Sequence, residues 1–531
     1  MIVIAVVFLL SLGALATFFL PPENRTSHIV VSLIPAAALG ALLLQLPFPE
    51  TFSVSWAPAA LFPEPLMFRA TSTSIAFAVY LCCLLILIEW TRPMRHSPGR
   101  SSRVVIYLLS ISGIFACFAS NPLAVILIWS WIDFVSFLVI LFLKSPVEIG
   151  SGGISSSLSH SMGILAINML GNILVVFSIF TAPAGSPSDW SIVWGESVPT
   201  LSTILFLIGI TFRLLIAPFQ FTFSRIQTAS TGVEVLLRIA SPAAVLCLLS
   251  NSWPALPVFS VGNAGGSWLI IPFSLVILMG GWQWYISTSP FERRDIFFLI
   301  LPSFALLSAL VQPQAGEIFL AAGAMLILGG GILLVYIGYL SHRRWMAGFL
   351  LLLGLLYSGI PFSPMSVWIA SVYPGLFTLS GFPVLLPLFL SHVFVVSALF
   401  RTAFESVEEF PSNEPLFLIT FSLGMGVCLS FLLYPGWSGA ASISSVAASM
   451  LLLLSAVLLV FLLRRFQRTG TSLLRILEKL FRLEWLQRGL VLSFQKTSVL
   501  VSGIESFLSG EGAMLWSLGV ALLLYLVFRG G

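Results

Sequence analysis

The stretch GITFRLLIAPFQF, residues 209–221, lies in one of the most apolar parts of the chain, yet it contains Arg213 and, five residues later, Pro218. A charged side chain at bilayer depth costs about 2.5–3.5 kcal/mol even on the lenient insertion scale. A proline in a spanning helix frees a backbone carbonyl where no water can bond it. The combination predicts a helix that is broken beside a buried charge.

The composition identifies a membrane protein. The 531 residues are 58% hydrophobic and 8% charged, with a mean hydropathy of +1.06, whereas soluble domains carry about 25% charged residues. A spanning helix needs about 20 apolar residues. The sequence predicts an all-α, polytopic fold with about 15–16 such helices. They fall at residues 1–20, 27–46, 72–90, 103–119, 121–143, 155–181, 199–224, 231–251, 267–287, 295–313, 316–340, 345–362, 375–402, 416–434, 440–463 and 512–528.

The placement of charge predicts the orientation. Basic residues gather in alternate loops, and the intervening loops hold few, with Arg69 the main exception. The basic loops contain Arg25, Arg92, Arg95, Arg100, Arg103, Lys144, Arg225, Arg293, Arg294, Arg343, Arg344, Arg401, Arg464, Arg465 and Arg468. By the positive-inside rule these loops face the cytoplasm, and the N-terminus lies outside. The longest outer loop, residues 47–71, is rich in Pro and Phe, so we expect it to pack over the ends of the spans.

Residues 464–510 differ from the spans. Apolar side chains follow helical spacing from Leu473 to Leu483, and charged side chains fill the other face. This pattern predicts an amphipathic helix in the plane of the membrane interface. It fits a brace along neighbouring spans and, equally, an ordinary surface helix between two spans.

Metal, cofactor and nucleic-acid chemistry are not indicated. The five cysteines lie within predicted spans and form no CxxC pair, so we expect small apolar core residues, with no metal and no cofactor. The sequence contains no phosphate-binding loop and no convincing nucleophile–base pair. A catalytic centre of its own is not predicted, and we expect no nucleic-acid partner.

A few ionisable residues remain at membrane depth, where charges normally face a protein or water-filled interior and pair with one another. Glu234 and Arg238 are four residues apart and can pair on one helix face. Asp133 and Arg213 lie on different spans and need each other or water. The candidate ion-translocation residues are Asp133, Arg213, Glu234, Arg238, His160 and His392. A structural ion pair and a hydrated charge path both fit this pattern.

Two stretches place a proline near the middle of a span and follow it with phenylalanine: residues 212–221, with Pro218, and residues 356–368, with Pro361 and Pro364. Broken helices at corresponding points of two halves are typical of internally repeated transporters, where the break lines a site or a water path. A simple proline kink is the alternative for each stretch.

These residues resemble the antiporter-like membrane subunits shared by respiratory complex I, membrane-bound hydrogenases and multisubunit cation/proton antiporters. GITFRLLIAPFQFTFSRIQTASTGVEVLLRIASP (209–242) is similar to their signature region, where a lysine precedes a Pro-Phe-His break and a second lysine follows in the next span. Arg213 and Arg238 match the two lysines, and Pro218 matches the break. SPFERRDIFFLILPSFALLSALV (289–311) and SGIPFSPMSVW (358–368) are similar to the tenth span and to the second broken helix.

The sequence also departs from the family pattern. Ile132 separates Trp131 from Asp133, whereas the acidic residue of the family follows its tryptophan directly. Gln220 replaces the histidine after the break. The lysine of the second broken helix falls near Trp368 and Ile369, and the eleventh span lacks the central lysine or histidine. Arginine effectively never releases its proton, so Asp133, Glu234, His160 and His392 are the residues best able to titrate.

The resemblance implies two inverted five-helix repeats with broken helices. The expected organisation is N-terminal spans (1–102), a first repeat (103–251), a second repeat (267–402), C-terminal spans (416–463), a lateral amphipathic helix (464–510) and a final span (511–531). It also implies a multi-pass protein of a bacterial or archaeal cytoplasmic (inner) membrane, in contact with other membrane subunits and with protons or Na⁺.

The function implied is that of a proton-translocating or proton-coupling subunit of an energy-converting complex, such as an NADH:quinone oxidoreductase-type translocase. A degenerate subunit that only docks and braces is also consistent. Two other interpretations stay open: the membrane coupling subunit of a two-component inorganic-carbon uptake system, and a stand-alone secondary transporter. The identity of the protein that co-purifies discriminates among them.

Overall fold

The structure is a bundle of helices. The computed structural model describes residues 2–20, 25–45, 50–54, 65–91, 100–142, 153–181, 201–214, 231–252, 267–286, 290–311, 316–338, 344–374, 382–404, 415–434, 437 and 443–466. The helices are α1 (Ile2–Phe19), α2 (Arg25–Gln45), α3 (Ser72–Thr91), α4 (Arg100–Phe118), α5 (Pro122–Phe142), α6 (Gly153–Phe180), α7 (Leu201–Arg213), α8 (Thr231–Ser252), α9 (Ser267–Ile286), α10 (Pro290–Val311), α11 (Gly316–Ala324), α12 (Gly330–Gly338), α13 (Arg344–Tyr357), α14 (Pro364–Val372), α15 (Phe382–Phe404), α16 (Pro415–Leu432) and α17 (Ile443–Phe466).

The predicted polytopic helical class is confirmed. In the described part of the chain, seven helices are long and apolar enough to cross a bilayer, and seven further apolar helical stretches have 10–17 residues. Helices suit the interior of a bilayer because each satisfies its backbone hydrogen bonds internally. Every predicted span up to residue 463 overlaps a helix. The predicted lateral helix lies outside the described residues beyond Phe466, and the span at 512–528 lies outside them entirely.

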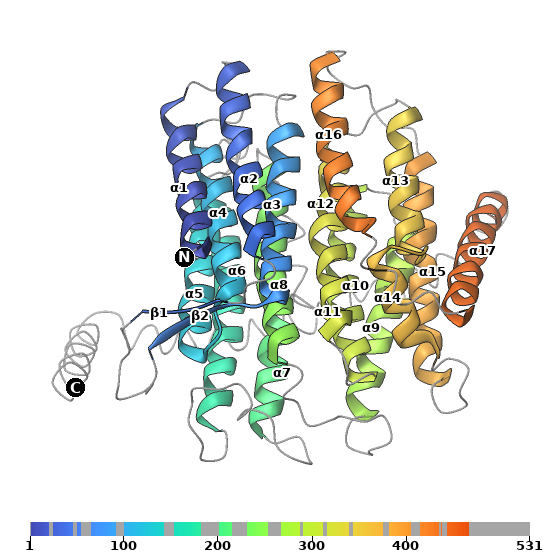
Figure 1. Ribbon diagram of the computed structural model, residues 1–531. Helices are drawn as coiled ribbons and strands as arrows, with labels where there is room; N and C mark the ends of the chain where they lie inside the picture. Colours follow the sequence, from blue (N-terminus) through green and yellow to red (C-terminus); the bar gives the residue numbers. More distant parts are fainter. Residues whose placement is uncertain are drawn as a thin grey trace.

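The helices fall into two groups that stand side by side (Figure 1). Helices α1 to α8 form one group, and α9 to α15 with α17 form the other; α16 packs against α3 at the junction. Helix α17 lies at the outer edge of the second group, packed on α15. The two predicted repeats, 103–251 and 267–402, therefore occupy different sides of the bundle, while their inverted symmetry stays a prediction.

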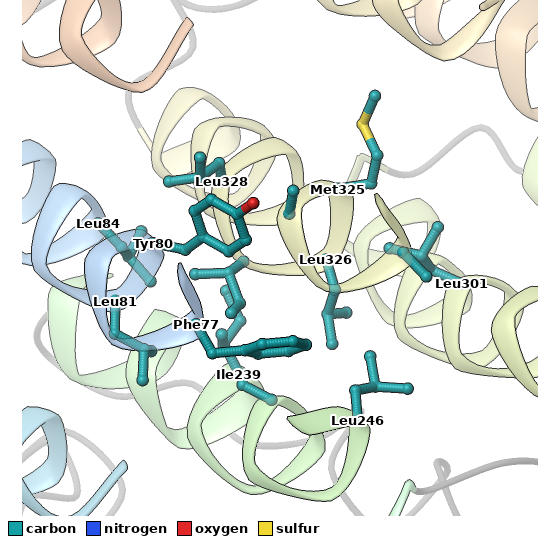
Figure 2. Close-up of a cluster of buried hydrophobic side chains, with 14 of the residues drawn as sticks. Phe77, Tyr80, Leu81, Leu84, Ile239, Leu246, Leu301, Met325, Leu326 and Leu328 are labelled. Carbon is teal, nitrogen blue, oxygen red and sulfur yellow. The ribbon is translucent and has the colours of Figure 1, made fainter. Parts of the chain in front are cut away.

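Apolar side chains fill the junction between the two groups (Figure 2). Helices α3 and α8 contribute from one side, and α10 and the turn between α11 and α12 from the other. The labelled side chains are Phe77, Tyr80, Leu81, Leu84, Ile239, Leu246, Leu301, Met325, Leu326 and Leu328, and all are buried. Apart from the Tyr80 hydroxyl, none of them offers a polar group. This part of the junction is a packed core and not a charged passage.

A short β-hairpin lies beside the ends of α4 and α5. Strand β1 (Glu50–Val54) pairs antiparallel with β2 (Leu66–Ala70), and the ring of Phe68 packs 4.5 Å from that of Phe115. The Asn121 side chain precedes α5, where it accepts from the amide of Ala124 (3.1 Å) and from that of Met67 in β2 (3.2 Å). The predicted loop over the span ends thus contains a hairpin, which the sequence did not indicate.

The second broken helix is present. Helix α13 ends at Tyr357, and α14 begins at Pro364 after Ser363, whose hydroxyl accepts from the amide of Ser366. Within the break Gly359 and Phe362 have positive φ angles of 82° and 67°. The Gly359 carbonyl accepts a hydrogen bond from the Ser449 hydroxyl of α17 (2.9 Å). A neighbouring helix therefore satisfies one of the carbonyls in the break, where a bilayer offers no water to do so.

A π-helical turn, Met325–Gly329, interrupts the eleventh predicted span between α11 and α12. Such turns have one extra residue and often lie at functional sites. The phenol of Tyr357 donates to the Met325 carbonyl at 3.1 Å. The π-helical turn and the broken helix are therefore joined directly by a side chain.

Candidate functional site

Helices α5 and α7 bring Asp133 and Arg213 into direct contact. The Nη1 group of Arg213 donates to both carboxylate oxygens of Asp133, and neither side chain has any exposed surface. Arg213 is the last residue of α7. A cation is stabilised at that position by the negative end of the helix dipole. Asp133 and Arg213, which the sequence predicted to need each other or water, therefore pair with each other.

Helix α6 completes the surroundings of the pair. The Asn172 amide donates to Asp133 Oδ2 at 3.0 Å and lies 3.4 Å from the Ser130 hydroxyl. The Arg213 guanidinium carbon lies 4.8 Å from the ring centre of Trp129, a cation–π distance. The carboxylate is thus bonded on two sides, and the guanidinium is held over an aromatic face.

Two glycines allow α6 and α7 to approach closely enough for this contact. A Cβ atom on Gly209 would lie 2.8 Å from the Gly171 carbonyl oxygen, and one on Gly171 would lie 3.0 Å from Cγ of Arg213. Real Cβ atoms do not approach a carbonyl oxygen this closely. The close crossing is therefore a condition for Arg213 to reach Asp133 from its position on α7.

Several buried polar atoms around the pair have no hydrogen-bond partner within the described residues. They are Nε and Nη2 of Arg213, Oδ1 of Asn168, Oδ1 of Asn172 and Nε1 of Trp129. Unsatisfied buried polar groups are costly, and ordered water commonly completes them. The set contains both donors and acceptors, which matches water better than an ion of either sign. The arrangement can therefore hold water beside an ion pair at membrane depth.

The second predicted pair forms within α8. Nη2 of Arg238 lies 3.3 Å from Oε1 of Glu234, and both side chains are largely buried. The Arg238 guanidinium carbon also lies 5.9 Å from the ring centre of Phe298 on α10. This pair thus faces the second group of helices, whereas the Asp133–Arg213 pair lies within the first.

His392 of α15 is buried in the second group. Its Nε2 lies 2.6 Å from the Tyr357 carbonyl and its Nδ1 lies 2.8 Å from the Tyr373 hydroxyl. Its ring also packs against Trp368, at the place where the resemblance predicts a lysine. A titratable side chain therefore does lie beside that position, but it comes from another helix.

The remaining predicted residues are placed only in part. His160 lies on α6, with its side chain outside the described residues, and Pro218 lies outside them altogether. Helix α7 ends at Arg213, and the predicted break at Pro218 stays a prediction. Pro361 lies within the second break, and Pro364 begins α14.

Sequence reasoning missed some of the buried polar residues. Asn168 and Asn172 of α6 were not singled out, although their four-residue spacing places both on one helix face. Arg103, which we expected in a basic loop, is fully buried three residues after α4 begins, and Glu89 of α3 is also buried. The prediction for Arg103 was wrong because α4 extends further toward its N-terminus than the apolar run does.

Comparisons with known proteins identify the fold. No protein-family profile and no curated protein matches the sequence. A chain of the Mrp complex from Dietzia sp. DQ12-45-1b matches with a TM-score of 0.70 at 15% identity, over 99% of this chain and 62% of that one. A chain of respiratory complex I from Thermus thermophilus matches with a TM-score of 0.64 at 14% identity, over 86% of this chain and 100% of that one.

A chain of the membrane-bound sulfane sulfur reductase, an archaeal respiratory membrane complex, matches with a TM-score of 0.65 at 13% identity, over 98% of this chain and 99% of that one. This chain therefore spans about 62% of the Mrp chain that it matches, and nearly all of the two others. The fold is that of the antiporter-like membrane subunits, as the sequence resemblance predicts.

Proposed function

We propose that this protein is an antiporter-like subunit of a multisubunit, energy-converting membrane complex, and that it takes part in moving protons or Na⁺. The observation that carries the proposal is the fully buried Asp133–Arg213 pair, which lies at the end of α7. Three chains with the same fold belong to membrane complexes, and two of those complexes are respiratory. Ionisable residues inside a membrane are rare and are by default candidate functional residues.

The chemistry of the pair assigns different roles to its members. Arginine keeps its proton, so Arg213 supplies a fixed positive charge. Asp133 is the member that can bind and release a proton, and its ionised form is stabilised while Arg213 contacts it. Proton uptake by Asp133 weakens the contact and leaves Arg213 to be solvated by water. The unpartnered atoms of Arg213, Asn168 and Asn172 provide sites for that water.

The other candidate residues extend the proposal beyond the first pair. We include Glu234 and Arg238 of α8, His160 of α6 and His392 of α15 as further parts of the ion pathway. We further propose that the chain lies in a bacterial or archaeal cytoplasmic membrane with its N-terminus outside, because the basic loops then face the cytoplasm. Other membrane subunits are its proposed partners.

Purification of the tagged protein from its native membrane in mild detergent, with mass spectrometry of what stays bound, tests the proposal. Redox subunits or other antiporter-like chains in the same particle are the expected result. A single zinc-binding partner would replace the proposal with carbon uptake. A protein that purifies alone, with bilayer lipids only, would replace it with a stand-alone transporter.

A further inference from the structure

One face of α6 contacts both members of the buried ion pair. Asn168, Gly171 and Asn172 lie on this face, because their spacing of three and four residues matches the helical turn. The Asn172 amide donates to Asp133 Oδ2 at 3.0 Å. A Cβ atom on Gly171 would lie 3.0 Å from Cγ and 3.2 Å from Cδ of Arg213. The same face therefore bonds the carboxylate and packs against the aliphatic part of the arginine.

The orientation of the Asn172 side chain is set by its partners. Its Nδ2 group has two hydrogens to donate. It donates to Asp133 and also to the hydroxyl of Ser130, 3.4 Å away and three residues earlier on α5. An ionised carboxylate only accepts hydrogen bonds, so the amide nitrogen must face Asp133. The amide oxygen of Asn172 is buried and has no hydrogen-bond partner among the described residues.

Asn168 repeats this arrangement one turn earlier on α6. Its side chain also donates to the Asp133 carboxylate, and its amide oxygen is likewise buried without a hydrogen-bond partner in the described part of the chain. Burial opposes the charged form of a carboxylate, whereas hydrogen bonds to its oxygens favour that form. The two asparagines therefore offset part of the cost of a buried charge on Asp133.

The charged groups near Asp133 on α6 and α7 are few. Among the described residues, Arg213 is the charged group that contacts Asp133, and α7 contains no other ionisable side chain. The ionisable residue of α6 is His160, which is twelve residues from Asn172, or about 18 Å along the helix.

Helix α4 also packs against α5. The Trp131 indole donates to the Ser112 hydroxyl at 3.1 Å, which places this part of α4 near the level of Asp133. Each ionisable residue of α4 is at least five residues from Ser112, or about 7 Å along the helix. These residues are Arg100, Arg103, Tyr107 and Cys117.

Helix α8 and strand β2 are the other packed elements that carry charge. Glu234 and Arg238 of α8 bond to each other, and the Arg238 guanidinium lies over the ring of Phe298 on α10. Arg69 of β2 is exposed beside the start of α5, which is eleven residues from Asp133, or about 16 Å. The groups in contact with the carboxylate are therefore Arg213 and the two asparagines of α6.

We propose that Asn172, supported by Asn168, is a positioning residue that orients the Asp133 carboxylate toward Arg213 and stabilises its ionised form. This role rests on the proposed function in that Asp133 is the group that exchanges a proton. It concerns the protonation of Asp133, however, and not the movement of ions. Loss of the Asn172 donor destabilises the ionised carboxylate, so Asp133 should then take up a proton at a higher pH.

Infrared spectroscopy of the purified full-length protein in lipid nanodiscs tests the role of Asn172. A protonated carboxyl group has a C=O band that an ionised one lacks, and the part of this band that is missing from Asp133→Asn belongs to Asp133. The pH at which this part reaches half of its full height is the protonation midpoint of Asp133. We expect Asn172→Leu to shift the midpoint toward higher pH by about one unit, since a hydrogen bond to a charged group changes an equilibrium roughly tenfold.

Asn172→Ala separates the lost donor from the added apolar volume of leucine. We expect a smaller shift in the same direction, because water can occupy the space and replace part of the hydrogen bond. Looser packing that merely admitted water would favour the ionised form and shift the midpoint toward lower pH. Ser178→Ala, whose hydroxyl donates to the Val175 carbonyl of α6 at 2.6 Å, is the matched control and should keep the native midpoint.

Three results would overturn the role of Asn172. The first is an equal midpoint in the native chain and in Asn172→Ala, and the second is a shift of either Asn172 variant toward lower pH. The third is a carboxyl group that stays in one protonation state, in both the native chain and Asn172→Leu, across the pH range in which the protein stays folded.

Ion movement in the reconstituted complex separates this role from the proposed function. If Asp133→Asn moves ions as the native complex does, the proposed function fails, and the infrared shift alone decides the role of Asn172. If Asp133→Asn loses ion movement while Asn172→Leu keeps the native midpoint, the role of Asn172 fails and the proposed function stands. If both are right, the pH profile of ion movement in Asn172→Leu shifts in the same direction as the midpoint.

Discussion

At the scale of single residues, the unusual feature is an arginine where a releasable proton is expected. Arg213 is fully buried, bonded to both oxygens of Asp133 and stacked on Trp129. Because the guanidinium stays charged, the state of this site changes only when Asp133 takes up a proton or when the two side chains separate. Arg213 therefore supplies a constant positive charge, and the protonation state of Asp133 is what changes.

The energetic coupling of the pair can be measured by a double-mutant cycle in detergent or bicelles. Asp133→Asn and Arg213→Gln each leave an uncompensated buried polar or charged group, and removal of one partner of a buried pair costs about 3–5 kcal/mol of the free energy of unfolding. We expect the double variant to be markedly more stable than the sum of the two single losses predicts. Additive losses would show that the two side chains do not interact in the folded protein.

The sequence was sufficient to pick out the charged residues but not all of their partners. Asp133 and Arg213 stand out because charge is rare in spans, and the pairing of Glu234 with Arg238 follows from their spacing on one helix. The contact between α5 and α7 depends on how α6 and α7 cross, which no local pattern encodes. Asn168 and Asn172 look like ordinary polar residues until the fold places Asn172 against Asp133 and Asn168 one turn away on the same helix.

At the scale of elements, the crossing of α6 and α7 controls the site. Gly209→Ala places a Cβ about 2.8 Å from the Gly171 carbonyl oxygen, and overpacking of this kind costs about 1–3 kcal/mol. We expect lower thermal stability and weaker ion movement, because α7 must shift away from α6 and carry Arg213 with it. Gly426→Ala on α16, where nothing lies within 4 Å of the added Cβ, is the control. Equal stability of the two variants would show that the close crossing is not required.

The break between α13 and α14 makes a similar prediction. Gly359 has a φ of +82°, and an added Cβ would also collide with Ile369. Gly359→Ala should therefore destabilise the second group of helices, which limited proteolysis and thermal unfolding would both detect. Gly348→Ala, within helix α13 and with nothing within 4 Å of the added Cβ, should be neutral or slightly stabilising, since alanine favours helices. A harmless Gly359→Ala variant would argue against a rigid break.

Helices and irregular segments differ in how well a sequence reveals them. Long apolar runs predict the helices, because a bilayer admits few other structures, and Pro361 and Pro364 mark the second break. The π-helical turn and the β-hairpin were not predicted. The first depends on backbone contacts such as that of Tyr357 with Met325, and the second on Asn121, which lies more than 50 residues from its partners.

At the scale of the whole molecule, two groups of helices meet at an apolar junction, and each contains its own buried polar cluster. Among the side chains labelled at that junction, Tyr80 alone carries a hydroxyl, and the others are apolar. The Asp133–Arg213 pair and His392 lie on opposite sides of it. Packed apolar side chains therefore separate the two clusters at this part of the junction.

The C-terminal segment bears on assembly. If the predicted lateral helix braces a neighbouring subunit, removal of residues 464–531 should weaken the association of that subunit with this chain, as measured by recovery of the partner after purification. Removal of residues 511–531 alone, which spares the predicted amphipathic helix, is the matched control and should retain more of the partner. Full recovery of the partner with the shorter chain would show that the segment is an ordinary surface helix.

The central claim, that Asp133 is the group through which this subunit takes part in ion movement, is tested most directly by reconstituting the purified native complex in liposomes. Proton and Na⁺ movement would be measured for the native chain, for Asp133→Asn and for Ser308→Ala, whose hydroxyl donates to the Phe304 carbonyl of its own helix. The account predicts that Asp133→Asn assembles but loses coupled ion movement, while Ser308→Ala keeps it. An Asp133→Asn complex that assembles and moves ions at the native rate would contradict the account.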